Sequence, residues 1–158
     1  MLAIEPKIGY KKKMKELKFR AWDKISKEIS NVKILDIFKR RIGLGWNSYD
    51  GITWRNIEDV MIMQYTGLKD KNGKEVYEGD IVKKSYHNGF CYLLIEHFSY
   101  KTVARILKNL PHEYVIGYEN FGNDYLYYDL YQLEGYDLEV IGNIYENPEL
   151  TILLTDDV

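Results

Sequence analysis

Three carboxylates stand close together in the middle of the sequence and are the residues best placed for acid–base chemistry. Glu75, Glu78 and Asp80 fall within six residues. Two neighbouring carboxylates can act as general acid and general base when their surroundings separate their pKa values. The run Glu78-Gly79-Asp80 also suits a turn in which the Asp80 carboxylate accepts backbone hydrogen bonds. We favour the turn, and we assign no catalytic residue.

Two patterns in the same region resemble ligand-binding loops but fail on spacing. Residues 67–74 resemble a phosphate-binding loop, yet five residues instead of four separate Gly67 from Gly73. A calcium loop that begins at Asp70 would need glutamate at its twelfth position, where Ile81 stands. The turn residues of a hairpin explain both patterns. The sequence therefore predicts neither a nucleotide site nor a calcium site.

The histidines and the cysteine form no recognisable metal or nucleophile motif. His87, His97 and His112 are ten or more residues apart, so they lack the i, i+4 pair of a helical zinc site. A ligand pair assembled through space stays open. Cys91 lies in an apolar run, where a buried and inert thiol is the ordinary outcome. We expect no metal and no cofactor.

The elements that position these residues are predicted to be short strands. Asp70-Lys71-Asn72-Gly73 and Asn88-Gly89 are tight-turn sequences between apolar runs, which predicts two hairpins. Residues 23–30 and the glycine-rich residues 42–51 are expected to be loops. Asn147 followed by Pro148 predicts the start of a short C-terminal helix.

The predicted strands are residues 17–22, 32–38, 60–65, 76–77, 81–86, 90–95, 103–107, 114–118, 125–133 and 138–145. Residues 34–38 also permit one helical turn. Short strands with frequent turns indicate a barrel or a coiled sheet.

Charge is divided unevenly along the chain. Residues 1–41 hold 13 Lys and Arg against five Asp and Glu, whereas residues 42–158 hold nine against 19. From Asn109 onward there are 11 acidic residues and no Lys or Arg. Such a split favours charged partners or self-association, although a basic leader lying beside an acidic domain explains it as well.

Tyrosine is concentrated in the acidic part, and this pairing predicts an interaction surface. Seven of the 15 tyrosines lie between Tyr114 and Tyr136. Tyrosine and tryptophan are enriched in protein interfaces, but they also suit a half-buried sheet face or a core. For a basic host or phage protein, we predict a contact surface that includes Glu119, Asp124, Tyr125, Tyr127, Asp129, Trp22 and Trp46, with Trp54 as a further candidate.

A second class of partner is suggested by the basic start of the chain. Lys11–Lys13, Lys15, Lys18 and Arg20 stand near Phe19 and Trp22, and a small barrel with such residues can combine phosphate contact with base stacking. The acidic remainder and a pI near 6.0 count against nucleic acid. Nucleic acid is therefore the alternative partner.

Three runs together resemble a known family. They are Lys18–Asp23 (KFRAWD), Gln64–Val82 (QYTGLKDKNGKEVYEGDIV) and Val140–Leu150 (VIGNIYENPEL). In this order they resemble the start, middle and end of YopX-family proteins of phages and prophages. The resemblance implies a mainly β fold with an SH3-like barrel or coiled β-sheet and no known enzymatic activity, and it supplies no catalytic or ligand residues.

The resemblance also divides the chain. We expect a flexible basic leader in residues 1–14, one YopX-like β-rich domain in residues 15–150 and a C-terminal tail in residues 151–158. Such proteins often begin at a methionine in the place of Met14, so both Met1 and Met14 are candidate starts. A start at Met14 would remove Lys11–Lys13 and weaken the charge argument.

Compartment and function follow from these observations. A single cysteine suits a reducing compartment, and no apolar run reaches the roughly 20 residues that cross a bilayer. We expect a cytoplasmic protein of the bacterial host with no membrane partner. The predicted function is a non-enzymatic binding or interaction module, with a nucleic-acid-binding small barrel or a small enzyme as alternatives.

Overall fold

The chain folds into short antiparallel strands with one α-helix. The computed structural model describes residues 16–45, 51–87, 89–98, 101–108, 119–120, 126–133 and 137–155. The first six strands are β1 (Phe19–Asp23), β2 (Glu28–Asp36), β3 (Arg41–Gly45), β4 (Ile52–Asn56), β5 (Val60–Lys69) and β6 (Glu75–Tyr77). The next six are β7 (Asp80–Tyr86), β8 (Gly89–Phe98), β9 (Lys101–Lys108), β10 (Glu119–Asn120), β11 (Leu126–Asp129) and β12 (Leu138–Asn143). The helix α1 spans Pro148–Thr155, and 3-10 turns span Ile57–Asp59 and Leu130–Leu133.

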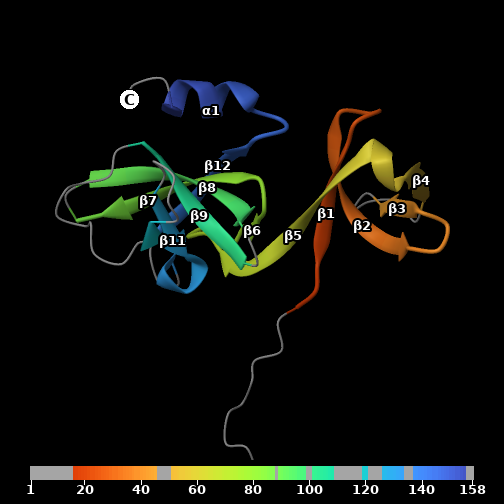
Figure 1. Cartoon of the computed structure of the whole chain (residues 1–158), viewed down its shortest axis with the longest axis horizontal. Helices are drawn as coiled ribbons and strands as arrows, with labels where there is room; N and C mark the ends of the chain where they lie inside the picture. The colour runs from red at the N-terminus through yellow and green to blue at the C-terminus, as the bar shows by residue number, and fades with distance from the viewer. Residues whose placement is uncertain are drawn as a thin grey trace, which may run out of the picture.

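These strands form two six-stranded sheets. The first sheet has the order β4-β3-β2-β1-β5-β6 and the second the order β10-β11-β9-β8-β7-β12. In Figure 1, β2, β3 and β4 lie at the right, β7, β8 and β9 lie at the left, and β5 crosses between them. The ten residues of β5 therefore connect the two halves of the molecule, and α1 lies along the second half.

Alternating side chains build the core of the first sheet. Ala21, Ile42, Leu44 and Val60 are buried together, with Val32 packed against them. Residues two apart on a strand point to the same face, so Ile42 and Leu44 face this core while Gly43 between them faces outward. The outer face is left with small or partly exposed side chains.

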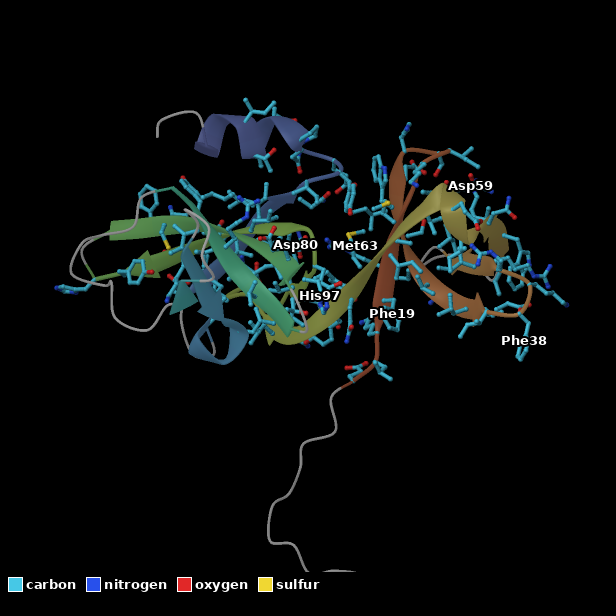
Figure 2. The ribbon with its side chains drawn as sticks, in the orientation of Figure 1. Phe19, Phe38, Asp59, Met63, Asp80 and His97 are labelled. Atoms are coloured by element: carbon cyan, nitrogen blue, oxygen red, sulfur yellow. The ribbon has the colours of Figure 1, made fainter. Side chains whose placement is uncertain are left out.

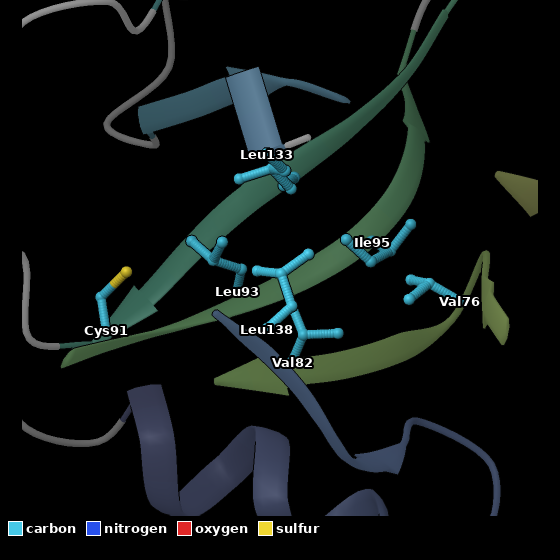
Figure 3. Packing of buried hydrophobic residues seen from close by; sticks show 8 residues of the cluster. Val76, Val82, Cys91, Leu93, Ile95, Leu133 and Leu138 are labelled. Carbon is cyan, nitrogen blue, oxygen red and sulfur yellow. The ribbon is translucent and has the colours of Figure 1, made fainter. Parts of the chain in front are cut away.

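The second sheet is apolar on both faces, because each face is covered. On one face, the buried residues are Val76, Val82, Cys91, Leu93, Ile95, Ala104, Leu133 and Leu138, most of which point toward one another in Figure 3. On the other face, Ile81, Leu94 and Leu107 pack with Leu150 of α1. Burial on both sides explains the unbroken apolar run from Phe90 to Ile95 in β8.

The structure confirms the main predictions of element type. The fold is mainly β with a short C-terminal helix. Hairpins occur at Asp70–Gly73 between β5 and β6 and between β7 and β8, where Tyr86 pairs with Gly89. The two sheets do not close into a barrel. Asn147 precedes α1, and its side-chain oxygen lies 3.3 Å from the Asn143 amide, which donates to it.

Several predicted boundaries were wrong. Most of β3 lies in the expected loop at 42–51, because its glycines look like turn residues but sit in a sheet where larger side chains would collide. The strand β4 was not predicted. The expected loop at 23–30 contains only the turn Lys24–Lys27, since β2 already begins at Glu28. Residues 37–38, predicted to end a strand, form a turn.

Other predictions fall only partly on described residues. The predicted strand 125–133 contains β11 followed by the 3-10 turn Leu130–Leu133. The predicted strand 114–118 and the leader 1–14 lie outside the described residues. Within the described ranges, no helix has both the length and the apolar character needed to cross a membrane.

Candidate functional site

The three sequence runs that resemble a known family meet where the two sheets join. Arg20 on β1 reaches Asp80 at the start of β7, and their side chains form a buried ion pair. The second Asp80 oxygen accepts a 2.8 Å hydrogen bond from the Tyr77 amide. In Figure 2, Asp80 and Met63 lie between the two halves of the molecule. We call this region the sheet junction; it comprises Arg20, Trp22, Met63, Tyr77, Asp80 and Tyr145.

Aromatic contacts complete the sheet junction. The Arg20 guanidinium lies 4.6 Å from the centroid of the Tyr77 ring, and one of its nitrogens lies 3.6 Å from the Met63 sulfur. Trp22 stacks on Tyr145, with ring centroids 6.1 Å apart and planes at 16°. These contacts join β1, β5 and β6 of the first sheet to β7 of the second sheet and to the segment after β12.

The carboxylates of the predicted acid–base cluster are all occupied by partners. Glu75 accepts a hydrogen bond from the Lys18 ammonium at 2.6 Å and another from the Tyr77 hydroxyl at 2.9 Å. Glu78 accepts hydrogen bonds from the Thr102 hydroxyl at 2.9 Å and the Gln64 amide at 3.2 Å. A carboxylate with every oxygen engaged is poorly placed to transfer protons to a substrate. The predicted turn at Glu78–Asp80 is confirmed, with the Asp80 carboxylate accepting a backbone hydrogen bond.

Protonation in the sheet junction follows from burial and contacts. Burial raises the pKa of Asp80 above its ordinary value, although the Arg20 guanidinium pulls it down. The Lys18 ammonium holds the pKa of Glu75 below its ordinary value. Burial and the Glu75 carboxylate raise the pKa of the Tyr77 hydroxyl. Each of these three groups has a hydrogen-bonding partner in or beside the sheet junction.

Asp70 is likewise a structural carboxylate. One of its oxygens accepts hydrogen bonds from the Asn72 and Lys74 amides at 2.8 and 2.9 Å, and the other accepts one from the Val140 amide at 3.2 Å. Burial alone would raise the pKa of Asp70, but these backbone hydrogen bonds lower it below its ordinary value. The hairpin turn is thereby tied to β12.

Two of the three histidines, His87 and His97, lie in the described residues with Cys91, whereas His112 lies outside them. Among the described residues, no group of three or more His, Cys, Asp and Glu is arranged to hold a metal ion. Cys91 is buried, as the sequence predicted, and its sulfur lies 3.3 Å from the Tyr86 hydroxyl. Burial raises the pKa of the Cys91 thiol, which keeps it protonated and unreactive.

Two strongly exposed apolar side chains lie at the turn between β2 and β3. Phe38 is 100% exposed and Ile37 is 74% exposed, and Figure 2 shows Phe38 at the far end of the hairpin. The turn itself is well tied: the Asp36 carboxylate accepts a hydrogen bond from the Lys39 amide at 3.0 Å, and the Arg40 carbonyl accepts one from the Ile57 amide at 3.0 Å. The backbone thus holds two large apolar side chains in solvent.

A second group of apolar side chains continues from this turn over the outer face of the first sheet. Ile34 on β2 is 40% exposed, and Ile52 and Trp54 on β4 are 41% and 39% exposed. They surround Gly43, where an added Cβ would lie 2.8 Å from an Ile52 methyl carbon. The Arg41 guanidinium lies 4.2 Å from the centroid of the Trp54 ring. We name as the apolar end the residues Ile34, Ile37, Phe38, Ile52 and Trp54.

Comparison with known proteins is informative at the level of the family. The family model described as YopX protein matches residues 18–151. The chain belongs to the YopX family. Among solved structures, this YopX chain is similar to protein EF1440 from Enterococcus faecalis, with 29% sequence identity, coverage of 86% of this chain and 98% of that chain, and a TM-score of 0.52. No curated protein matches it.

The structure places the predicted contact residues of this YopX chain in different surroundings. Trp22 is half-buried in the sheet junction, and Trp54 is in the apolar end. Glu119 and Tyr127 are paired neighbours on β10 and β11, and Asp129 on β11 pairs with Val103 of β9. Three other predicted residues lie outside the described residues, namely Trp46, Asp124 and Tyr125.

Sequence reasoning missed the two most exposed members of the apolar end. Ile37 and Phe38 follow a β-branched run, and this pattern predicts that they end a strand. The signal that marks them as a turn is the flanking charge, with Asp36 before and Lys39, Arg40 and Arg41 after. A turn-favouring aspartate followed by three cations is unusual for a buried strand.

Proposed function

We propose that this YopX-family chain is a binding module that contacts another protein through its apolar end. The observation that carries the proposal is the complete exposure of Phe38 beside the largely exposed Ile37, on a turn held by backbone hydrogen bonds. Large apolar side chains that are ordered in solvent are strong candidates for burial against a partner. The occupied carboxylates of the sheet junction favour this reading over an enzyme.

Charge near the apolar end bears on the class of partner. Lys33 and Lys39 are two further cations of this region, and Lys39 is close enough to Asp36 to help lower the pKa of its carboxyl. Arg40 and Arg41 are paired with Glu58 and Asp36. A surplus of cations around an apolar patch suits a partner that carries carboxylates beside apolar residues.

Capture from a bacterial host lysate tests the proposal. The tagged chain, F38S and I37S are compared with I25S, because Ile25 is also an exposed isoleucine in a turn, at 62% exposure, but lies outside the apolar end. We expect F38S and I37S to retain at least about tenfold less partner, which corresponds to about 1.4 kcal/mol. I25S should retain the wild-type amount. Equal recovery of the same proteins by all four chains would exclude the apolar end as the contact.

Nucleic acid is the alternative partner. Cations at the apolar end, Lys33 and Lys39, are combined with the aromatic residues Trp54 and Phe38, and such a combination can contact phosphates and stack on bases. Nuclease treatment of the same lysate separates the two classes. A partner protein should survive nuclease, whereas retention that is lost with nuclease and falls steeply with salt would favour nucleic acid.

The acidic, tyrosine-rich part of the chain stays a second proposed contact surface, for a basic protein of the host or phage. Its support is the content of acidic residues and tyrosine after Asn109. The triple substitution E119S/D124S/D129S should weaken such a contact more at low salt than at high salt. Unchanged capture at both salt concentrations would remove this surface from consideration.

Three finer features of the chain belong to the same proposal. The strand order β4-β3-β2-β1-β5, with the 3-10 turn Ile57–Asp59 between β4 and β5, supports an SH3-like element. Family membership supports a phage or prophage origin. The single buried Cys91 suits the reducing cytoplasm of a bacterial host.

A further inference from the structure

We propose that the outer face of β2, β3 and β4 binds an amphipathic α-helix of a partner protein, and that this helix carries a carboxylate at each end of its apolar stripe. The inference rests on the proposed function, since it needs a partner protein at the apolar end, and it adds the form and the charge pattern of that partner. Binding through the apolar face of an amphipathic helix is one of the recurring modes of protein recognition.

Glycine on β3 lets the apolar side chains of this face lie close together. An added Cβ at Gly43 would lie 2.8 Å from an Ile52 methyl carbon and 3.3 Å from Ile34 Cβ. It would also lie 3.6 Å from a carbon of the Trp54 ring. The three side chains therefore form one apolar surface over Gly43, and each of them is 39–41% exposed.

Two cations lie at opposite ends of this apolar surface, on the same face. The Arg41 guanidinium is stacked on Trp54, 4.2 Å from the centroid of the ring. At the other end, Lys33 is the extra residue of a bulge in β2, and its aliphatic chain lies over Gly45. Arg41 and Gly45 are four residues apart on β3, so these positions are separated by about 13 Å along the strand.

Both cations are placed to meet carboxylates of a partner. Arg41 contacts Asp36 through its Nε at 3.4 Å, and an arginine held flat on a ring presents the rest of its planar fork to a second carboxylate. Among the described residues, the ion pairs of this region join Asp36 to Arg41 and Glu58 to Arg40, and neither includes the exposed Lys33. A partner with carboxylates at these two places complements the charge of the face.

The form of the partner follows from where its backbone would lie. The backbone N–H and C=O groups of β3 pair with β2 and β4 within the plane of the sheet. An extended segment lying on the face would therefore bury unpaired backbone groups, whereas an α-helix satisfies its own. Two helix residues seven apart lie on one side, about 10.5 Å from each other, and flexible glutamate and lysine side chains cover the remaining distance to the cations.

Four helix-forming peptides with the full chain test the inference. Each has sixteen residues, mainly alanine and glutamine, with leucine at positions 8 and 9. The parent has glutamate at positions 5 and 12, on the same side of the helix as the leucines. The second peptide has lysine at those two positions, the third moves the glutamates to positions 7 and 14 on the opposite side, and the fourth is the parent with proline at position 10, which breaks the helix.

Binding is measured from NMR shifts of the Gly43 and Gly45 amides and the Trp54 indole N–H. We expect the parent peptide to shift these signals, and each of the other three peptides to bind at least about tenfold more weakly. Binding of any of the three as tight as that of the parent, or no shift at the solubility limit of the parent, would overturn the proposal.

A matched pair of variants links these results to the chain. K33Q removes one cation from the outer face and should weaken the parent peptide about two- to fivefold at low salt, the range of an exposed ion pair. K27Q, at an exposed lysine in the turn between β1 and β2, should leave binding unchanged. Circular dichroism checks that both variants are folded, and equal affinity of the two for the parent peptide would contradict the assigned charge pattern.

The peptides and the lysate capture can fail separately. Loss of the partner by F38S with no binding of the parent peptide would leave the proposed function in place and exclude the helix. Peptide binding in the expected order, with the partner still retained by F38S and I37S, would exclude the turn as the contact and keep the outer face.

Discussion

At the scale of single residues, buried charge decides what the central motifs do. Asp80 and Arg20 are each almost fully buried and form an ion pair, and Asp80 also accepts a hydrogen bond from the Tyr77 amide. The buried Nε of Arg20 has no hydrogen-bond partner among the described residues. A buried ion pair adds little stability when compared with apolar residues, but loss of one partner leaves the other charge uncompensated. Residues that resemble an acid–base cluster in sequence therefore act here as structural groups.

Replacement of Asp80 by asparagine tests this role. D80N leaves the buried Arg20 guanidinium without its counter-charge, and we expect the free energy of unfolding to fall by about 3–5 kcal/mol. Urea denaturation followed by circular dichroism measures it. The control is E58Q, which removes an exposed ion pair with Arg40 and should change stability little. A D80N protein as stable as E58Q would contradict the structural role.

The Asp70 turn gives a prediction about pH. The folded-state pKa of Asp70 lies below its ordinary value of 3.8, so the ionised carboxylate contributes stability above that pH and loses it as the pH falls through the folded value. In D70N, an NH2 group replaces one of the side-chain oxygens and cannot accept the backbone hydrogen bonds that this oxygen accepts in Asp70. We expect this change to lower the free energy of unfolding by about 1–3 kcal/mol at neutral pH.

The difference in unfolding free energy between wild type and D70N should therefore shrink below about pH 4. Denaturant titrations at pH 7, 5 and 3 measure it, and D137N, at an exposed aspartate, serves as the control. A difference that stays constant across this range would show that the charge of Asp70 is not what the turn uses.

At the scale of elements, the glycines of β3 show why a strand was mistaken for a loop. Gly43 and Gly45 lie on the outer face, where an added Cβ would come within 2.8 Å of Ile52 and 2.7 Å of Lys33. The glycines are needed for close packing of neighbouring side chains and not for a turn. Sequence alone does not separate these two uses of glycine.

A pair of glycine substitutions separates them by experiment. G43A places a methyl group against the β-branched Ile52 and should lower the free energy of unfolding by about 1–3 kcal/mol. The matched variant G51A meets no atom within 4 Å and should be neutral or slightly stabilising. Thermal unfolding of both variants measures this, and equal melting temperatures would contradict the packing role of Gly43.

At the scale of the whole molecule, the sheet junction couples two sheets that each have their own core. The first core contains Ala21 and Leu44 and the second contains Leu93 and Leu138. The contacts between the two sheets include Trp22 on Tyr145 and Arg20 on Asp80, and Val76 of β6 packs into the second core. We therefore expect the two sheets to unfold as one cooperative unit.

W22A tests this coupling, because it removes the stacked ring while leaving both cores intact. We expect the free energy of unfolding to fall by about 2–3 kcal/mol. In native-state hydrogen exchange, the opening free energies of the slowest-exchanging amides of β2 and of β8 should fall by the same amount. Exchange that accelerates in β2 alone would show that the sheets open independently.

The sequence by itself determined most of the element types, both tight hairpins, the C-terminal helix and the family. These follow from local features, namely alternating apolar residues and turn-forming residues such as Asp70 and Gly73, which act between neighbours in the chain. The same local information also pointed to a turn at Glu78–Asp80.

Only the tertiary structure decided which aromatic and apolar residues face a neighbour and which face solvent. Trp22 is buried because Tyr145, from the far end of the chain, stacks on it, whereas Phe38 has no such neighbour among the described residues. Exposure depends on which distant segments meet, and residue type carries little information about that. For the same reason, the edge position of β4 became visible only when the order of the strands was known.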